Sequence, residues 1–320
     1  MSIECTVFKG TSGNYFVREL GGTETYCVKL RGTLKKDLEY STSLSHARRV
    51  TRARKRRATD PVSVGDTVII DPKTLQIEEV LPRRSEFART TPGGHEQHVL
   101  VANLDTVFVT VAAANPYPNF WLLDRFLVAA ESAELNAQII INKVDLAEDI
   151  AATRKEAAVY ERIGYPVHFT AARSGQGVDE LMAALKGKIS AFAGPSGVGK
   201  SSLLNAIEPG LRLKTGEVSE VTHLGRHTTT TAELIPLKYD VDTWVADTPG
   251  LRQVEFWEIE SQNIEFCFPE FKEFFGQCQF SNCTHQTEPG CAIREASRTG
   301  QIDKRRYDSF IQMMTPEPAF

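Results

Sequence analysis

Two short motifs in this chain combine residue types that can bind a nucleotide. The stretch 194–201 reads Gly-Pro-Ser-Gly-Val-Gly-Lys-Ser. Its glycines let backbone N–H groups turn toward phosphates, Lys200 can reach the β- and γ-phosphate oxygens, and the hydroxyl of Ser201 can bind Mg²⁺. A chance match in a glycine-rich turn is the weaker interpretation, because an apolar run precedes the motif and a helical pattern follows it. This loop alone is compatible with ATP as well as GTP.

The second motif, Asn142-Lys143-Val144-Asp145, favours guanine. Asp145 can accept two hydrogen bonds from the N1 and exocyclic amino groups of guanine, which adenine lacks, and Asn142 can bond to the carbonyl edge. Lys143 is expected to pack over the ring, and the stretch 170–172 can add a backbone N–H. The predicted GTP ligands are Asn142, Lys143, Val144, Asp145, Gly194, Pro195, Ser196, Gly197, Val198, Gly199, Lys200, Ser201, Ser202, Asp247 and Gly250.

The order of these motifs is unusual. The base motif comes first, the phosphate loop second and Asp247-Thr248-Pro249-Gly250 last, whereas in ordinary GTPases the phosphate loop leads. Because a nucleotide site is assembled from strand ends that meet in space, a chain can be cut and rejoined elsewhere without losing the chemistry. The order therefore predicts a circularly permuted GTPase.

Hydrolysis requires groups beyond the phosphate loop. We expect Ser201, Thr230 and Asp247 to hold Mg²⁺, with Thr229 as the second choice for the threonine, and the N–H of Gly250 to meet the γ-phosphate. Leu251 stands where many GTPases carry a water-positioning glutamine. His227 is the nearest polar substitute, although a structural or partner-binding histidine is an equal alternative. The predicted catalytic residues are His227, Lys200 and Thr230.

A separate cluster near the C-terminus predicts a metal site. Cys278, Cys283, His285 and Cys291 place three thiolates and one imidazole within a short segment, a set that suits closed tetrahedral Zn²⁺ with a structural role. A disulfide pair or unrelated surface side chains are the alternatives. Seven nearby aromatic residues fit a small core better than an RNA-stacking surface. These are Phe256, Trp257, Phe266, Phe268, Phe271, Phe274 and Phe275.

The patterns around these motifs predict a multidomain α/β protein. Short strand-forming runs separated by glycines indicate a β-barrel of the oligonucleotide-binding type over 1–82. Buried apolar strands that alternate with helices indicate a doubly wound GTPase domain over 83–255, and 256–320 is the zinc-binding domain. The barrel contains a basic run for which we favour RNA phosphate contact over a solvated loop. Its cations are Arg48, Arg49, Arg52, Arg54, Lys55, Arg56 and Arg57.

Composition limits the remaining possibilities. The chain has 320 residues, of which 41% are hydrophobic and 24% charged, and a net charge of −4, which argues against a uniformly basic nucleic-acid binder. No apolar run approaches the length of a membrane span, and the first ten residues lack the features of a signal peptide. We expect a cytoplasmic monomer that has no membrane contact. In that reducing compartment the six cysteines favour metal ligation or burial over disulfides.

Taken together, these motifs resemble the RsgA (YjeQ) family of small-ribosomal-subunit-dependent GTPases. The resemblance spans nearly the whole chain and rests on the permuted motif order, the stretch Gly225-Arg226-His227-Thr228-Thr229-Thr230 and the Cys-x4-Cys-x-His-x5-Cys spacing. It implies GTP hydrolysis stimulated by the small ribosomal subunit and its rRNA, in late subunit maturation, with one structural Zn²⁺ and with Mg²⁺ bound alongside GTP. Only the stretch 170–172 matches the family pattern loosely.

Two other classes of function must be weighed. An enzyme acting on a small substrate would need a second constellation of acids, bases or nucleophiles, and the sequence offers none beyond the nucleotide motifs. A nucleotide-dependent RNA-binding scaffold with negligible hydrolysis is the stronger alternative, because Leu251 cannot orient water. Phosphate release stimulated by small subunits discriminates among the three.

Overall fold

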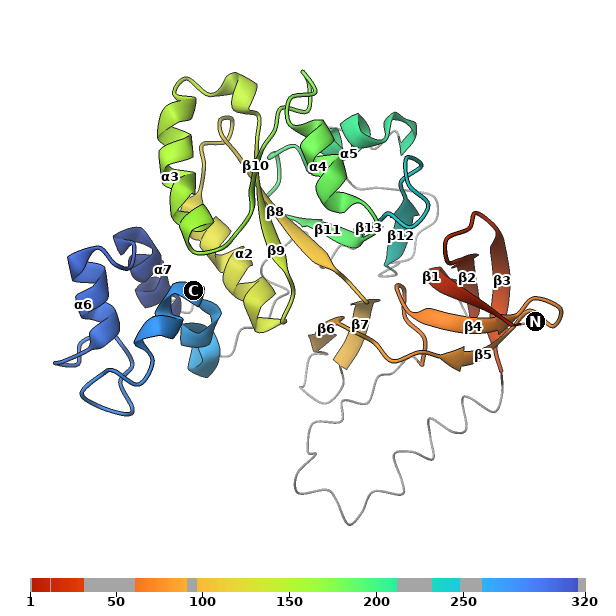
Figure 1. Ribbon diagram of the computed structural model, residues 1–320, viewed down its shortest axis with the longest axis horizontal. Helices are drawn as coiled ribbons and strands as arrows, with labels where there is room; N and C mark the ends of the chain where they lie inside the picture. The colour runs from red at the N-terminus through yellow and green to blue at the C-terminus, as the bar shows by residue number, and fades with distance from the viewer. Residues whose placement is uncertain are drawn as a thin grey trace, which may run out of the picture. The chain divides into compact units, whose positions relative to one another are not determined.

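The computed structural model describes residues 2–11, 13–31, 61–90, 97–211, 232–247 and 261–315 (Figure 1). The chain folds into two compact units. The first unit contains Met1–Thr106, Leu181–Phe192 and Glu220–Phe256, and the second contains Val107–Glu180, Ala193–Ser219 and Trp257–Phe320. Within the described ranges, no helix combines the length and the apolar character needed to cross a membrane.

A five-stranded barrel forms the start of the first unit. Its strands are β1 (Ile3–Thr11), β2 (Asn14–Glu19), β3 (Thr25–Leu30), β4 (Thr67–Asp71) and β5 (Gln76–Val80). They pair in the order β1-β2-β3-β5-β4, and β4 pairs with β1 to close the barrel. Alternate side chains point inward and make a core of valine and isoleucine that also contains Cys5. The expected N-terminal β-barrel is confirmed. The basic run from Arg48 to Arg57 lies outside the described residues.

The first unit also holds a hairpin and a small parallel pair. Strands β6 (Glu86–Thr90) and β7 (Gln97–Ala102) are antiparallel. Strand β11 (Ile189–Ala193) runs parallel to β13 (Trp244–Asp247), which pairs antiparallel with β12 (Glu233–Pro236). Strand β12 also meets β1 of the barrel, where Lys9 lies opposite Glu233. The barrel and the β12–β13 hairpin are therefore connected by backbone pairing.

Three parallel strands organise the second unit. They are β8 (Thr106–Ala112), β9 (Ala137–Asn142) and β10 (Val167–Phe169), with β9 in the middle. Every residue of β8 and β9 is buried, as their continuous apolar runs predict. Helices α2 (Phe120–Ser132) and α3 (Ile150–Arg162) lie beside these strands (Figure 1). Asn119 and Asp149 cap the two helices by accepting backbone hydrogen bonds, which fixes where each helix begins.

Short elements follow the strands that precede the two predicted nucleotide motifs. The 3₁₀ turn η2 (Val144–Leu146) follows β9, and α4 (Val178–Leu185) follows β10. Helix α5 (Lys200–Ile207) and the turn η3 (Pro209–Leu211) follow β11 in sequence. These bounds place both predicted nucleotide motifs directly after a strand, where ligands meet α/β sheets.

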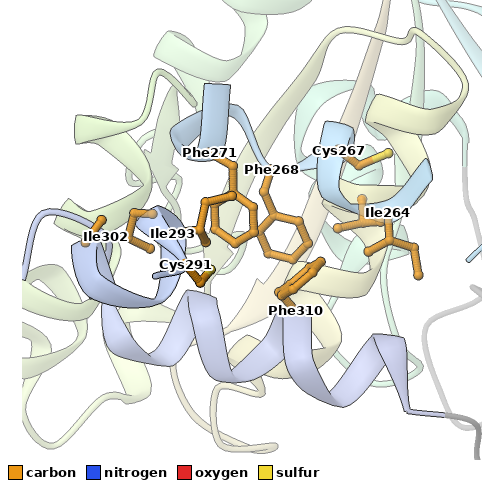
Figure 2. Close-up of a cluster of buried hydrophobic side chains, with 10 residues drawn as sticks. Ile264, Cys267, Phe268, Phe271, Cys291, Ile293, Ile302 and Phe310 are labelled. Carbon is orange, nitrogen blue, oxygen red and sulfur yellow. The ribbon is translucent and has the colours of Figure 1, made fainter. Parts of the chain in front are cut away.

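The C-terminal segment packs around an aromatic core. It contains the 3₁₀ segments η6 (Ser261–Cys267) and η7 (Pro269–Phe274), followed by α6 (Ala292–Thr299) and α7 (Lys304–Met314). Figure 2 shows the rings of Phe268, Phe271 and Phe310 gathered together, with centroids 4.9–5.6 Å apart. All three are fully buried, and Val128 of α2 joins the cluster. Phe268 and Phe271 are therefore core residues, whereas Phe266 is 62% exposed.

Candidate functional site

The phosphate loop turns through three glycines that no other residue can replace without strain. Gly194, Gly197 and Gly199 have φ angles of +131°, +80° and +95°. A Cβ on Gly194 would lie 2.2 Å from the carbonyl oxygen of Thr110, and one on Gly199 would lie 2.4 Å from Nδ2 of Asn142. The loop therefore approaches β8 and β9 too closely for a side chain at Gly194 or Gly199.

Lys200 lies over this loop. Its Nζ donates hydrogen bonds to the carbonyl oxygens of Gly194 at 2.7 Å and Pro195 at 2.8 Å. Lys200 also begins α5, so the ammonium group and the N-terminus of the helix lie together, and both favour a bound anion. Ser201 and Ser202 follow in the first turn of α5. The predicted phosphate-binding residues are thus brought together.

The base motif is tied directly to the phosphate loop. Asn142 ends β9, and its Nδ2 donates to the carbonyl oxygen of Val198 at 2.9 Å. Its Oδ1 accepts from the hydroxyl of Thr170 at 3.1 Å, and the N–H of Val144 donates to the carbonyl oxygen of Thr170. Asn142 and Thr170 are both buried. Three segments that are far apart in sequence therefore meet at one amide group, which orients that amide before any ligand binds.

Lys143 and Asp145 occupy the turn after β9. Lys143 adopts a left-handed conformation with φ +62°, and its Nζ donates to the carbonyl oxygen of Asn115. Burial lowers the pKa of Lys143, and the negative charge of Asp145 opposes that shift. Asp145 itself is exposed, so its carboxylate is accessible to a ligand. A Cβ on Gly199 would lie 3.7 Å from Cε of Lys143, so the lysine stem runs beside the phosphate loop.

The remaining predicted nucleotide residues divide into two groups. Asp247 ends β13 in the first unit, where it lies opposite Glu233 in the strand pairing. Gly250, His227, Thr229 and Thr230 lie outside the described residues. In the stretch 170–172, the N–H groups of Thr170 and Ala171 donate to the carbonyl oxygens of Ile141 and Gln176 within the protein, which leaves Ala172 to supply the expected N–H. Thr170 also acts through its side chain, whose hydroxyl donates to Asn142.

The four predicted metal ligands converge in the C-terminal segment. The ligand atoms of Cys278, Cys283, His285 and Cys291 all lie within 4.8 Å of one another. Nδ1 of His285 is 3.5 Å from Sγ of Cys278 and 3.4 Å from Sγ of Cys291. A tetrahedral ion with bonds of about 2.3 Å to sulfur and about 2.1 Å to nitrogen would separate sulfur from nitrogen by about 3.6 Å. The donor set and its spacing therefore fit a zinc-sized ion.

Surrounding groups orient these ligands. Nε2 of His285 lies 2.9 Å from Oε2 of Glu265, so the imidazole can donate to the carboxylate and turn the lone pair of Nδ1 toward the sulfurs. The N–H groups of Ala292 and Arg294 donate to the sulfurs of Cys278 and Cys291, each at 3.4 Å. Such N–H···S contacts stabilise thiolates. The arrangement can hold a metal with no open coordination position, as a structural site requires.

Comparisons with known proteins identify relatives over most of this chain. A model of the RsgA GTPase family matches residues 80–257. The small ribosomal subunit biogenesis GTPase RsgA of Gemmatimonas aurantiaca is 41% identical over 311 residues, which cover 96% of this chain and 95% of that relative. This chain belongs to the RsgA GTPase family. It is therefore a GTP hydrolase by family.

Solved structures extend the likeness of this RsgA GTPase family member to the fold. The crystal structure of YjeQ from Thermotoga maritima aligns with a TM-score of 0.76 and 34% identity, over 98% of each chain. The structure of YloQ, a circularly permuted GTPase, aligns with a TM-score of 0.71 and 29% identity, over 99% of this chain and 98% of that one. The predicted fold, a barrel followed by a permuted GTPase and a C-terminal segment that can bind metal, is confirmed.

The C-terminal cations of this family member have partners within the protein. Arg306 is fully buried, and its guanidinium contacts the carboxylates of Asp124 at 2.8 Å and Glu270 at 2.7 Å. Burial alone would lower the pKa of Arg306, but the two carboxylates outweigh it and hold the pKa well above its usual value. The hydroxyls of Tyr160 and Ser309 also donate to Asp124. This buried network joins α7 to α2.

Other cations on these helices form ion pairs at the surface. Arg305 contacts Glu156, Arg298 contacts Glu295, and Lys304 contacts Asp308. Arg306 is not available to bind RNA phosphate, because carboxylates enclose it. The sequence does not predict the Arg306 network, because Arg306 is one of three cations in a Lys-Arg-Arg run and has no local signal of its own. It does not predict the role of Glu265 either, because a glutamate among aromatic residues is not distinctive.

Proposed function

We propose that this chain hydrolyses GTP in response to the small ribosomal subunit and acts in late maturation of that subunit. The observation that carries the proposal is the hydrogen bond from Asn142 to Val198, which joins the base motif to the phosphate loop. The RsgA relative is named for small-subunit biogenesis, and the chain covers 95% of its length. Small-subunit rRNA is the proposed partner, contacted through the basic run from Arg48 to Arg57.

In this proposal each part of the nucleotide is recognised by a different group. Asp145 accepts hydrogen bonds from guanine, and Asn142 has a second N–H hydrogen for the base, since only one donates to Val198. The backbone N–H groups of 194–202 surround the phosphates, and Lys200 neutralises negative charge on them. The residues that would hold Mg²⁺ are Ser201, Asp247 and Thr230. The domain limits 1–82, 83–255 and 256–320 belong to the same proposal.

The reaction itself needs a positioned water molecule. We assign His227 as the group that orients this water, because Leu251 replaces the glutamine found in many GTPases. Lys200 stabilises charge that develops on the phosphate oxygens in the transition state. Small-subunit binding is proposed to position His227, which would let a chain without the glutamine act as a GTPase.

The metal cluster has a structural role in the proposal. Cys278, Cys283, His285 and Cys291 would hold one Zn²⁺, which contributes folding free energy to the C-terminal segment when it is bound. Glu265 would keep His285 in the tautomer that presents Nδ1 to the ion. The protein would work as a cytoplasmic monomer, without membrane contact.

The deciding experiment measures phosphate release from GTP with and without purified small subunits. The parent protein should be strongly stimulated. Lys200→Ala should weaken both nucleotide binding and turnover, whereas His227→Ala should bind GTP normally and lose about a hundredfold in stimulated turnover. Lys155→Ala, on the exposed side of α3, is the matched control and should behave like the parent.

The outcomes separate the alternatives. A parent protein that binds GTP and small subunits but releases no phosphate would be the RNA-binding scaffold, and the hydrolysis proposal would be wrong. If His227→Ala hydrolyses GTP on small subunits as fast as the parent, another group positions the water.

A further inference from the structure

The barrel is connected to Asp247 by a continuous line of paired backbone. Lys9 of β1 lies opposite Glu233 of β12, and Glu233 lies opposite Asp247 of β13. Nζ of Lys9 also contacts Oε2 of Glu233 at 3.0 Å. A lateral row of three residues therefore crosses three strands, from the barrel to the last residue of β13.

An irregularity in β1 directs an aromatic side chain onto the hairpin. The pairing of β1 with β2 shifts between Val7 and Lys9, which leaves Phe8 as an extra residue. Such bulges reorient a side chain and are common near functional sites. The ring of Phe8 stacks on Trp244 of β13, with centroids 6.0 Å apart and planes at 19°. The barrel thus extends one of its own side chains to the strand that ends at Asp247.

A second barrel strand covers the same indole. The guanidinium carbon of Arg18 on β2 lies 4.5 Å from the centre of the Trp244 ring. Trp244 is only 3% exposed. At the turn of the hairpin, the N–H of Gly21 donates to Oδ1 of Asp242 at 2.9 Å. The barrel therefore holds the β12–β13 hairpin at Glu233, Asp242 and Trp244.

Arg18 is not explained by stability alone. Burial lowers its pKa, opposed by the charge of Asp242, and its Nε is buried with no hydrogen-bond partner among the described residues. An unpaired buried donor costs stability, and an apolar side chain of similar length would avoid that cost. Such unsatisfied groups require an explanation, of which a functional role is one.

We propose that Phe8, Arg18 and Trp244 form a junction that positions Asp247 and couples RNA binding at the barrel to the Mg²⁺ side of the GTP site. The inference rests on the proposed function for the roles of the barrel and of Asp247. Trp244 begins the four-residue strand that Asp247 ends, a span of about 10 Å at about 3.3 Å per residue. A shift of the indole is transmitted along a paired strand of that length because the hydrogen bonds on both sides prevent bending.

The test uses two variants of the barrel. Phe8→Ala removes the stacked ring, and Arg18→Met keeps an alkyl stem over Trp244 without the guanidinium and its buried Nε. Both should raise the Mg²⁺ concentration for half-maximal hydrolysis and lower turnover at saturating small subunits, each by about 2- to 30-fold, as coupling residues typically do. Small-subunit affinity, measured by co-sedimentation, should not change.

Controls distinguish the junction from general damage to the barrel. Phe8→Tyr keeps the ring and should restore the parent behaviour, and Tyr26→Ala truncates an aromatic side chain packed against the barrel core. Arg18→Met should fold at least as well as the parent, so a loss of coupling in that variant cannot be attributed to unfolding.

Three results would overturn the inference. One is unchanged Mg²⁺ dependence and turnover in Phe8→Ala and Arg18→Met. Another is a loss of small-subunit affinity with turnover at saturation intact, since the junction would then serve binding only. The third is an equal effect of Tyr26→Ala. If the parent protein is not stimulated by small subunits, the proposed function fails instead, and the Mg²⁺ dependence of the variants still decides whether the junction positions Asp247.

Discussion

The nucleotide site and the metal cluster hold their functional groups in place by different means. At the nucleotide site, Asn142 is bonded to Val198, 56 positions away, and to Thr170, 28 positions away. In the metal cluster the ligands come from one short segment, and their sulfur and nitrogen atoms face one another. The first arrangement is satisfied by protein groups alone, whereas the second brings together thiolates that repel each other unless a cation lies between them.

This difference suggests which site depends on its ligand for structure. The base motif should keep its shape without nucleotide, because its buried amide is already paired. The C-terminal segment should keep its shape only with metal, apart from what the core of Phe268, Phe271 and Phe310 contributes. Removing each support in turn tests the contrast.

Metal removal should have the largest effect. Cys283→Ser or a strong chelator removes a contribution on the order of 10 kcal/mol to folding of the C-terminal segment. Amide hydrogen exchange should rise across 261–315, while 137–145 stays protected and GDP still binds. Cys27→Ser, at an exposed cysteine of the barrel, is the control and should keep the full metal content. If elemental analysis finds no metal in protein purified without chelator, the C-terminal segment does not depend on metal for its structure.

Asp145→Asn should have the next largest effect, and it should act on binding without unfolding the site. The change removes two hydrogen bonds from guanine to a charged group, each of about 1.5–3 kcal/mol, so GTP affinity should fall about a thousandfold. Preference should shift toward xanthine nucleotides. Titration with fluorescent GDP and XDP measures both affinities. Asp149→Asn makes the same substitution at the cap of α3 and should leave GTP affinity unchanged. If Asp145→Asn also keeps the GTP affinity of the parent, Asp145 does not bind the guanine base.

Asp124→Ala tests the buried network between α2 and α7. It leaves Arg306 with one carboxylate fewer in a fully buried position, which should lower the free energy of unfolding by about 3–5 kcal/mol. Arg305 lies on α7 next to Arg306, and its partner Glu156 is 53% exposed. Glu156→Ala should therefore change the free energy of unfolding by less than about 1 kcal/mol. Urea unfolding followed by tryptophan fluorescence measures both. Equal effects would mean that burial does not distinguish the two pairs.

The smallest effect is expected at Glu265. Glu265→Gln keeps the size of the side chain but weakens its hold on His285, so metal affinity should fall about 10- to 100-fold. Competition with a chromophoric chelator gives this value independently of GTP hydrolysis. Glu273→Gln, an exposed glutamate on η7, is the matched control. An affinity equal to that of the parent would show that His285 needs no external orientation.

The sequence predicted the groups that carry a local signature. Apolar runs placed β8 and β9, and the motifs after β9 and β11 gave the base and phosphate segments, because each chemistry needs particular residues at fixed spacing. The metal ligands were recoverable for the same reason. The start of α2 at Phe120 is set by the cap at Asn119, a residue type that commonly begins helices.

The sequence could not predict partners that are defined only by tertiary contact. The contacts from the hydroxyl of Thr170 to Asn142 and from the carboxylate of Glu265 to His285 involve residues of ordinary type, and no local spacing encodes them. Arg306 was indistinguishable from its surface neighbours Lys304 and Arg305, since its burial depends on carboxylates 182 and 36 positions away. Residue type identifies what a group can do, but only the fold decides what it meets.

The separation of Arg306 from Asp124 also has a consequence during synthesis. At about 5–20 residues per second, the 182 residues between them take about 9–36 s to appear, and during that time Asp124 has no cationic partner. Helix α2 therefore cannot finish packing until α7 has left the ribosome. We expect chains arrested before residue 300 to show little protease resistance in α2, which limited proteolysis of ribosome-bound nascent chains would measure. The packing of α2 would then be completed only after α7 has been synthesised.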